Sequence, residues 1–181
     1  MFGDSLVDLE YGTVEPDELD EIWDLYSAVV MNLSGTSEDP LWVMGVNPSR
    51  EKFARKIEQG CLHAAYVYGQ PVAATLIEQG FVGGYETFPW KSGIPLEETA
   101  VLRLFAVVPN MRGHKISTRF LNYCISAARE QGYKALRLDV MPHLAHSAAL
   151  FTSCGFESQG LAELAHEDER MRQSNLYELV L

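Results

Sequence analysis

Two cations and a glycine stand in a short turn at residues 109–115, and their spacing is typical of an anion-binding site. After Pro109 the chain carries Arg112, Gly113, His114 and Lys115. The first turn of a helix has free backbone N–H groups and the positive end of the helix dipole. If a helix begins here, these amides and the two cations can bind an anion together, and phosphate is the anion that we expect.

The residues on either side of the turn predict the elements that would position it. Residues 99–108 are mostly apolar and β-branched, which favours a central strand with both faces covered. Pro109 ends this strand because proline has no N–H group to donate to a sheet. Apolar residues then recur at helical spacing, which predicts a helix over residues 115–131. The turn therefore joins a buried strand to the N-terminus of a helix.

The chain after this helix predicts three strands and one more helix. Residues 135–140 alternate as a strand, residues 145–153 fit a short helix that Gly155 stops, and Phe156 begins another strand. A last strand near residues 175–181 can pair within the chain or between two chains. A homodimer therefore stays open.

The first half of the chain predicts a strand, two helices and a hairpin. The strand covers residues 6–14, and Pro16 with its acidic neighbours opens the first helix. The second helix follows the capping residues 47–49 and runs to residue 59. Residues 62–79 hold two apolar runs around a short polar link, which favours an antiparallel hairpin.

Residues 80–98 show no sustained period and predict one long loop. Loops of this length are usually functional or disordered, and this one is too apolar for disorder. Its aromatic residues are Phe81, Tyr85, Phe88 and Trp90. We expect the loop to form part of a binding pocket or a lid, with a hydrophobic flap or a dimer contact as the alternative.

The turn and its surroundings resemble the acetyl-CoA-binding motif of the GNAT N-acetyltransferase superfamily. That motif reads Arg or Gln, two residues, Gly, one residue, then Gly or Ala. Arg112 matches its first position, whereas Lys115 stands where the family usually has glycine and Ser117 where it has Gly or Ala. The order of elements over residues 99–159 is similar to the core of the family, and the order in the first half is similar as well.

The resemblance implies a fold and a cofactor. The fold is α/β (α+β), a mixed and mostly antiparallel central sheet of about six to seven strands, parallel at the fourth and fifth strands, with about four helices, in a single domain over residues 1–181. The cofactor is acetyl-CoA. In the family, the backbone of the fourth strand holds the pantetheine and the acetyl carbonyl, and the turn takes the pyrophosphate. The corresponding residues are Phe105, Ala106 and Val107 in the strand, then Arg112, Gly113, His114, Lys115, Ile116 and Ser117.

Acetyl transfer to an amine also requires that the amine lose a proton and that the departing thiolate gain one. A carboxylate often takes the amine proton in the family, and Glu86 and Asp139 are the candidates. Many members use a tyrosine to protonate the thiolate, but Phe151 occupies that position and has no proton to give. Ser147 lies one helical turn earlier on the same face, so Ser147 or a water is the substitute that we expect. His143 and His146 are further options.

Leu144 is another departure, because it stands where an asparagine often contacts the cofactor. Without an efficient acid, catalysis would be slowed by about a hundredfold to ten-thousandfold. Two functions therefore stay open. The first is an N-acetyltransferase that acts on a primary amine of a small molecule or peptide; the alternative is a GNAT-fold acyl-CoA-binding or regulatory protein with weak or no catalysis. Nucleotide hydrolysis is disfavoured because the turn lacks the spacing of a P-loop.

The acceptor side is predicted partly from the resemblance and partly from the residues. In the family, the loop between the first two helices borders the acceptor, which places Trp42 and Met44 near the substrate. Tyr85 and Trp90 are candidates from the aromatic loop. Arg103 interrupts an apolar strand, so it must pair with an acid, reach solvent or line a pocket. If it lines the pocket, the substrate carries a carboxylate as well as an amine.

Composition sets the remaining limits. A chain of 181 residues with 47% hydrophobic residues and a mean hydropathy of -0.07 suits one domain with a real core. A net charge of -11 argues against nucleic acid and anionic membrane surfaces as partners and weakly favours a cationic acceptor. Three widely spaced cysteines indicate reduced thiols and no metal site. With no signal peptide or apolar run long enough to span a membrane, we expect a cytoplasmic protein.

Overall fold

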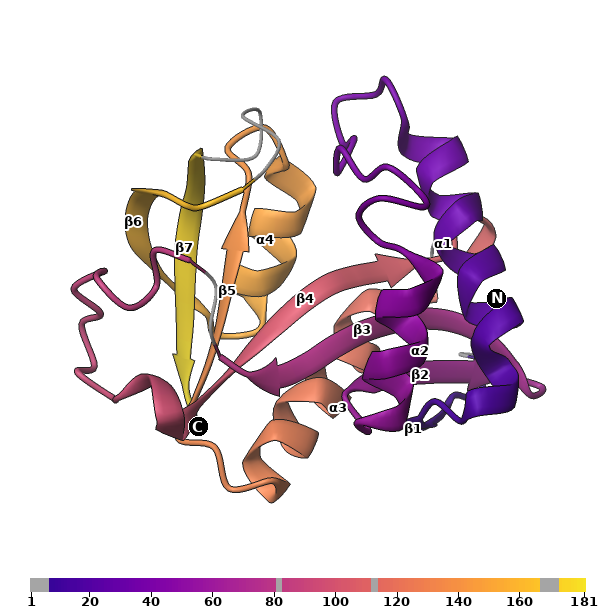
Figure 1. The fold of residues 1–181 in the computed structure, drawn as a ribbon, viewed down its shortest axis with the longest axis horizontal. Helices are drawn as coiled ribbons and strands as arrows, with labels where there is room; N and C mark the ends of the chain where they lie inside the picture. Colours follow the sequence, from indigo (N-terminus) through magenta and orange to yellow (C-terminus); the bar gives the residue numbers. More distant parts are fainter. Residues whose placement is uncertain (1–6, 81–82, 112–113, 167–172) are drawn as a thin grey trace, which may run out of the picture.

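The computed structural model describes residues 7–80, 83–111, 114–166 and 173–181, and there the chain forms a seven-stranded mixed sheet (Figure 1). The strands lie in the order β1-β2-β3-β4-β5-β7-β6. Only β4 and β5 pair in parallel; the other neighbours are antiparallel. The bounds are β1 Glu10–Thr13, β2 Leu62–Val67, β3 Gln70–Gln79, β4 Thr99–Val107, β5 Ala135–Val140, β6 Glu157–Glu163 and β7 Gln173–Val180. The predicted fold class is confirmed.

Four α-helices are described: α1 Leu19–Leu33, α2 Arg50–Glu58, α3 Ile116–Glu130 and α4 Ala145–Ser153. Short 3-10 turns cover Pro16–Glu18, Leu96–Glu98 and Pro109–Met111. The local signals act as expected, because Pro16 begins the turn that leads into α1 and the Ser49 side chain accepts a hydrogen bond from the backbone N–H of Lys52 at the start of α2.

Helices and one loop cover the two faces of the sheet. In β4, Leu102 packs in the core cluster formed with α3 and α4, whereas its neighbour Val101 packs beneath the loop of residues 83–98. In β7, Tyr177 and Leu176 divide in the same way. Because successive residues of a strand point to opposite faces, the loop lies on the face opposite α3 and α4. The helices α1 and α2 pack over β2, β3 and β4 in a separate cluster (Figure 1).

The last strand pairs within the chain. β7 lies between β5 and β6 and is hydrogen-bonded to both, so the within-chain alternative for residues 175–181 is the one observed. The first strand is shorter than predicted, starting at Glu10, and residues 1–6 lie outside the described part of the chain.

The parallel pairing between β4 and β5 is short, and this positions the site. Only Thr99, Ala100 and Val101 of β4 have partners in β5. Beyond them the two strands diverge, as Figure 1 shows, with β5 leading toward α4 and β4 toward α1. The rest of β4 therefore has a strand partner on its β3 edge alone.

Candidate active site

A cavity of about 910 Å³ occupies the place where β4 and β5 separate. This volume is near the upper end of what ligand pockets usually enclose. β4 and β5 form its floor, the start of α3 and the length of α4 form one wall, and the loop between α1 and α2 forms another. The candidate site residues in its lining are Trp42, Arg103, Phe105, Ala106, Val107, Lys115, Ile116, Ser117, Asp139 and Ser147; Leu144 and Phe151 line it too.

A β-bulge shapes the β4 side of this cavity. Between the pairs Ala74↔Ala106 and Leu76↔Arg103, β4 contains one residue more than β3. Leu104 adopts a φ of 54°, a conformation that non-glycine residues seldom take. Its carbonyl accepts a 2.6 Å hydrogen bond from the hydroxyl of Tyr26, which fixes the bulge from α1. A bulge re-aims the strand, and half of the backbone groups on an unpaired edge point away from the neighbouring strand, here toward the cavity.

The N-terminus of α3 forms the far end of the cavity. Lys115 is the N-cap residue with a φ of 53°, so this lysine has the backbone conformation of a glycine at the motif position where glycine is usual. Its side chain is exposed, while Ile116 behind it is buried. Arg112 and Gly113 lie outside the described residues. His114 is described and half-buried, but it is not part of the cavity wall.

Asp139 is the carboxylate that the structure brings into the cavity. It lies near the end of β5, and its Oδ1 accepts a 2.9 Å hydrogen bond from the hydroxyl of Tyr85. Tyr85 is completely buried, and burial together with the carboxylate raises the tyrosine pKa well above its ordinary value. The phenol therefore stays protonated and keeps one oxygen of Asp139 fixed.

α4 contributes the residues expected near the leaving group. Ser147 and Phe151 both line the cavity, one helical turn apart. Phe151 is 5% exposed and packs edge-to-face against Phe105 at 5.8 Å and Phe156 at 5.7 Å between ring centroids. Phe151 is therefore held in the core with only part of its ring at the cavity.

The loop of residues 34–49, between α1 and α2, closes the cavity on the acceptor side. Trp42 packs its ring 5.6 Å from that of Tyr26. Two contacts join this loop to the other wall: His143 Nε2 donates to the carbonyl of Asp39 at 2.8 Å, and His146 Nδ1 lies 3.0 Å from a carboxylate oxygen of Glu38. Met44 packs in the α1–α2 cluster and is not in the cavity lining.

The described part of the aromatic loop, residues 83–98, packs on the sheet as a hydrophobic flap, the alternative for this segment; Phe81 lies outside the described residues. Tyr85 and Trp90 pack over the far half of the sheet and Glu86 accepts a hydrogen bond from the N–H of Gly84, so none of these three lines the cavity. The reason is a buried ion pair. Arg137 Nε donates to Glu178 at 2.7 Å, and Arg137 Nη2 donates to the Ile94 carbonyl at 2.8 Å, which ties the loop to β5 and β7.

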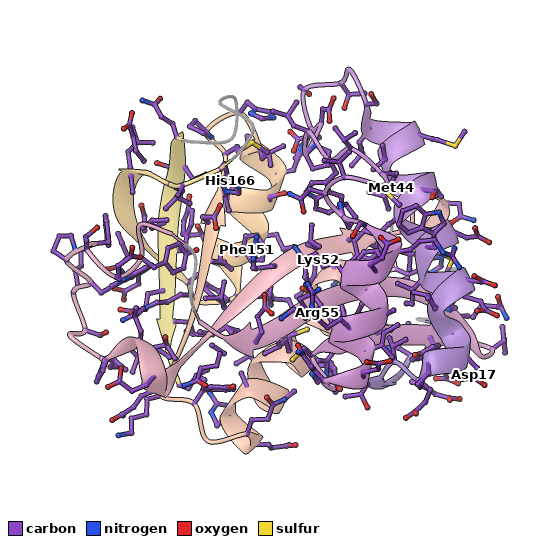
Figure 2. The ribbon with its side chains drawn as sticks, viewed as in Figure 1. Asp17, Met44, Lys52, Arg55, Phe151 and His166 are labelled. Atoms are coloured by element: carbon purple, nitrogen blue, oxygen red, sulfur yellow. The ribbon has the colours of Figure 1, made fainter. Side chains whose placement is uncertain are left out.

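Arg103 meets two of its three alternatives at once. It lines the cavity, and its Nη1 lies 3.6 Å from Glu78 on β3. Glu78 is closer to Lys56 of α2, at 2.5 Å. Burial and the charge of Arg103 lower the pKa of another α2 residue, Lys52, to about 8. Figure 2 shows Lys52 at the side of α2 that faces α4, where Phe151 is labelled.

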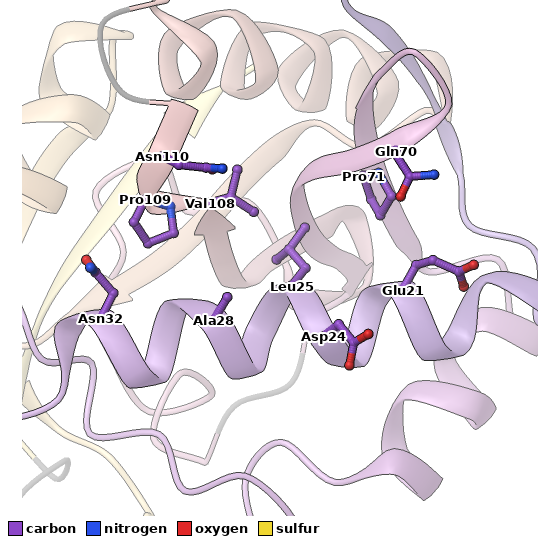
Figure 3. Close-up of a pocket in the computed structure, with 10 residues that line it drawn as sticks. All are labelled: Glu21, Asp24, Leu25, Ala28, Asn32, Gln70, Pro71, Val108, Pro109 and Asn110. Atoms are coloured by element: carbon purple, nitrogen blue, oxygen red, sulfur yellow. The ribbon is translucent and has the colours of Figure 1, made fainter.

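A second hollow, of about 430 Å³, lies between α1 and the turn that follows β4 (Figure 3). Its rim includes Glu21 and Asp24 of α1 and Pro71 of β3, and Figure 3 shows the α1 side chains along one side with Asn110 opposite. It contains no predicted site residue. The candidate site is therefore the larger cavity.

The sequence reasoning missed several residues that shape the site. The bulge at Leu104 has no signal, because leucine does not favour its conformation. Tyr26 is one of several apolar residues at helical spacing in α1, and nothing in that spacing marks it as a partner of β4. The basic run in α2 was a usable signal, since Arg50, Lys52, Arg55 and Lys56 are four of the chain's fourteen basic residues.

Three general findings complete the picture of the described residues. None of their histidine, cysteine and acidic side chains gather into a group that could hold a metal ion. None of their helices is long and apolar enough to cross a membrane. Cys61, Cys124 and Cys154 are free thiols.

Comparison with known proteins gives a consistent result. Residues 29–156 match the family model described as the acetyltransferase (GNAT) family. No curated protein sequence matches the chain at a significant level. Among solved structures, a GNAT-family acetyltransferase from Streptococcus agalactiae is similar, with a TM-score of 0.76, 14% identity and coverage of 96% of this chain and 95% of the other.

Two further structures have the same fold. The ribosomal-protein-alanine N-acetyltransferase from Brucella melitensis has a TM-score of 0.67 and 20% identity, covering 95% of this chain and 99% of its own. The protein yncA from Salmonella typhimurium, solved with its cofactor acetyl-CoA, has a TM-score of 0.67 and 13% identity, covering 96% of this chain and 94% of its own.

Proposed function

The chain belongs to the acetyltransferase (GNAT) family, and from that premise we propose that it transfers an acetyl group from acetyl-CoA to a primary amine of a small molecule or peptide. The observation that carries the proposal is the cavity itself. It combines an unpaired β4 edge, the N-terminus of a 15-residue helix and a carboxylate in one space.

The chain's own residues suit the cofactor. The backbone of Phe105, Ala106 and Val107 would bind the pantetheine arm along the β4 edge, as an added strand does. The first-turn amides of α3, with Lys115 and Ser117 in the cavity wall, would bind the diphosphate. Arg112 and Gly113 belong to this proposal through the family motif. When bound, acetyl-CoA supplies the activated acetyl group.

Asp139 is the proposed general base. The acceptor amine must lose a proton as its nitrogen bonds to the acetyl carbon, and the carboxylate can accept that proton directly or through a water. Tyr85 orients the carboxylate through its hydrogen bond to Oδ1. Ser147 or a water would supply the proton that the leaving thiolate of the cofactor needs, since Phe151 cannot donate one.

The second candidate, a GNAT-fold binding or regulatory protein with weak catalysis, is favoured by one observation. Phe151 packs tightly in the core where a proton donor is usual, so the leaving group depends on a weaker acid. Both candidates bind the cofactor and differ in turnover.

Two measurements test the proposal. Calorimetry with acetyl-CoA and with the non-reactive desulfo-CoA measures cofactor binding, and the release of free thiol across a panel of amines measures transfer. We expect binding of both cofactors and thiol release that depends on an amine. Binding without any amine-dependent release selects the second candidate, and absence of binding rejects both.

A further inference from the structure

Charged side chains gather beside the cavity in a way that the transfer reaction alone does not require. We call Lys52, Lys56, Glu78 and Arg103 the basic cluster. Its members come from α2, β3 and β4, and Arg103 forms part of the cavity lining. The cluster contains three cations and one carboxylate, in a chain whose net charge is -11. Positive charge is therefore concentrated here against the trend of the whole protein.

Glu78 cannot satisfy all three cations. Its Oε2 lies 2.5 Å from Lys56 Nζ, whereas its Oε1 is 3.6 Å from Arg103 Nη1, which is beyond a normal hydrogen bond. Among the described residues, the Arg103 side chain makes no hydrogen bond in addition to this ion pair. A guanidinium has five N–H donors in a planar fork that matches a carboxylate. Arg103 thus reaches the cavity, 26% exposed, with donors to spare.

The pKa of Lys52 responds to the excess positive charge of the cluster. This pKa is lowered to about 8, first by burial and then by Arg103, while Glu78 acts in the opposite direction and Lys56 and Arg55 add to the lowering. An anion that entered the cavity near Arg103 would relieve this repulsion. Such a ligand would contact Arg103 in the cavity lining, and Lys52, which is outside that lining, would add its positive charge at short range until that charge is lost near pH 8.

The basic cluster does not belong to the cofactor's diphosphate. Arg103 lies four residues before Val107 on β4, on the order of 12 Å at the rise of an extended strand, and the start of α3 lies beyond Val107. Arg103 is instead next to the bulge at Leu104. It lines the same cavity as the loop of residues 34–49, which closes the acceptor side. The charge is positioned for the acceptor.

Building on the proposed function, we propose that the acceptor is an amine that also carries a carboxylate, as an amino acid does, with Arg103 as the partner of that carboxylate and the nearby charge of Lys52 adding to the attraction. The negative charge of the whole chain attracts the ammonium group of such a zwitterion, and the basic cluster binds its acid group. A plain amine or a basic peptide side chain would leave the cluster with Glu78 as its single carboxylate partner.

Matched acceptors test this directly. The rate constant kcat/KM is measured with acetyl-CoA for amino acids, for their carboxamides and for the amines that lack the carboxyl group. A charge-assisted contact of this kind corresponds to a preference of about tenfold to a hundredfold for the carboxylate. In Arg103→Met the preference should fall to near one, and Arg103→Lys should retain part of it. Arg50→Gln is the control. Arg50 is a cation of α2, the helix that carries Lys52, but it pairs with Asp20 and does not line the cavity.

A second readout does not depend on turnover. Calorimetry with a simple carboxylic acid that has no amine should show binding that weakens as the pH rises past about 8, where Lys52 loses its charge. Lys52→Met should bind the acid more weakly and without this pH dependence. Circular dichroism confirms that each variant is folded; Glu78 keeps Lys56 as a partner when Arg103 is replaced.

The outcomes separate this inference from the proposed function. Equal rates with carboxylate and carboxamide, or equal losses for all acceptors in Arg103→Met, overturn the inference while amine-dependent thiol release still supports transferase activity. If acetyl-CoA binds but no carboxylate-bearing compound reacts or binds, the inference is overturned and cofactor binding stands. If acetyl-CoA does not bind, the proposed function fails on its own measurement.

Discussion

The loop of residues 34–49 and the loop of residues 80–98 each carry a tryptophan, and both were expected to border the acceptor, yet they have different roles. Trp42 in the first loop lines the cavity and packs beside Tyr26. Trp90 in the second packs against Tyr85 and Phe88, with the guanidinium of Arg137 4.2 Å from its ring centre, away from the cavity. Aromatic content therefore does not separate a binding loop, here residues 34–49, from a loop that only covers the sheet, here residues 83–98, which we call the scaffold loop.

The anchors of the two loops explain the difference. Arg137 and Glu178 hold the second loop from beneath, and their side chains are 0% and 3% exposed. The first loop is joined to the opposite wall through His143 and His146, and the side chain of His146 is 88% exposed. A buried charge pair needs every partner in place and so fixes a loop, whereas exposed contacts are weak enough to leave a cavity wall adjustable.

The largest effect should come from replacing one carboxylate in the cavity, Asp139 of β5, and comparing it with Glu86 in the second loop. Asp139→Asn keeps an oxygen for Tyr85 to donate to but removes the group that accepts the amine proton. We expect kcat to fall by about a hundredfold to ten-thousandfold in steady-state assays. Glu86→Gln in the scaffold loop should leave kcat unchanged. A larger loss in Glu86→Gln would reverse the roles assigned to the two carboxylates.

The anchor of the scaffold loop should dominate stability. Arg137→Met leaves Glu178 buried with Ser92 as its remaining hydrogen-bond donor, so the free energy of unfolding should fall by about 3–5 kcal/mol in urea denaturation. The double variant Arg137→Met/Glu178→Met should recover much of this loss, since it removes the unpaired charge. If the single variant were as stable as the parent chain, the buried pair would not be what fixes this loop.

The cavity and the scaffold loop also show what the sequence could predict. The bounds of β5 and α4 agree with the prediction because β5 alternates as a strand does and α4 is a short segment that Gly155 stops. Trp42 was expected near the acceptor from the resemblance to the GNAT family, and it lines the cavity. The position of the 80–98 loop depends on the pairing of Arg137 with Glu178, 41 residues apart in the chain. No local pattern reports such a pairing.

The backbone of the site was also beyond local patterns. Leu104 and Lys115 both adopt left-handed conformations that a sequence usually signals with glycine. At Lys115 the missing glycine read as a departure from the family motif, although the chain keeps the glycine conformation there. At Leu104 the conformation is imposed by long-range partners, because Tyr26 bonds its carbonyl and Thr75 bonds the carbonyl of Arg103 at 2.9 Å.

The two tryptophans offer a more direct comparison of the loops. Trp42→Ala should raise the KM for the acceptor by about tenfold, the effect of losing one large apolar contact, with little change in cofactor affinity. Trp90→Leu should lower the free energy of unfolding by about 2 kcal/mol, through lost ring and cation contacts, and leave the acceptor KM unchanged. Initial-rate kinetics and thermal melts on the same samples distinguish the two. A change in acceptor KM for Trp90→Leu would place the scaffold loop in the binding site after all.

The smallest expected effect is at the exposed contacts of the first loop. In the double variant His143→Ala/His146→Ala, the contacts to Asp39 and Glu38 are lost, and the free energy of unfolding should change by less than about 1 kcal/mol because exposed pairs contribute little. The loop would then be held mainly by Trp42 and Tyr26, so the acceptor KM should rise by about threefold while kcat is retained. The ratio of the two changes is the informative quantity. In Arg137→Met we expect a lower free energy of unfolding and an unchanged acceptor KM. In the double histidine variant we expect a higher acceptor KM and a nearly unchanged free energy of unfolding. If the histidine variant lost as much stability as Arg137→Met, both loops would be fixed in the same way.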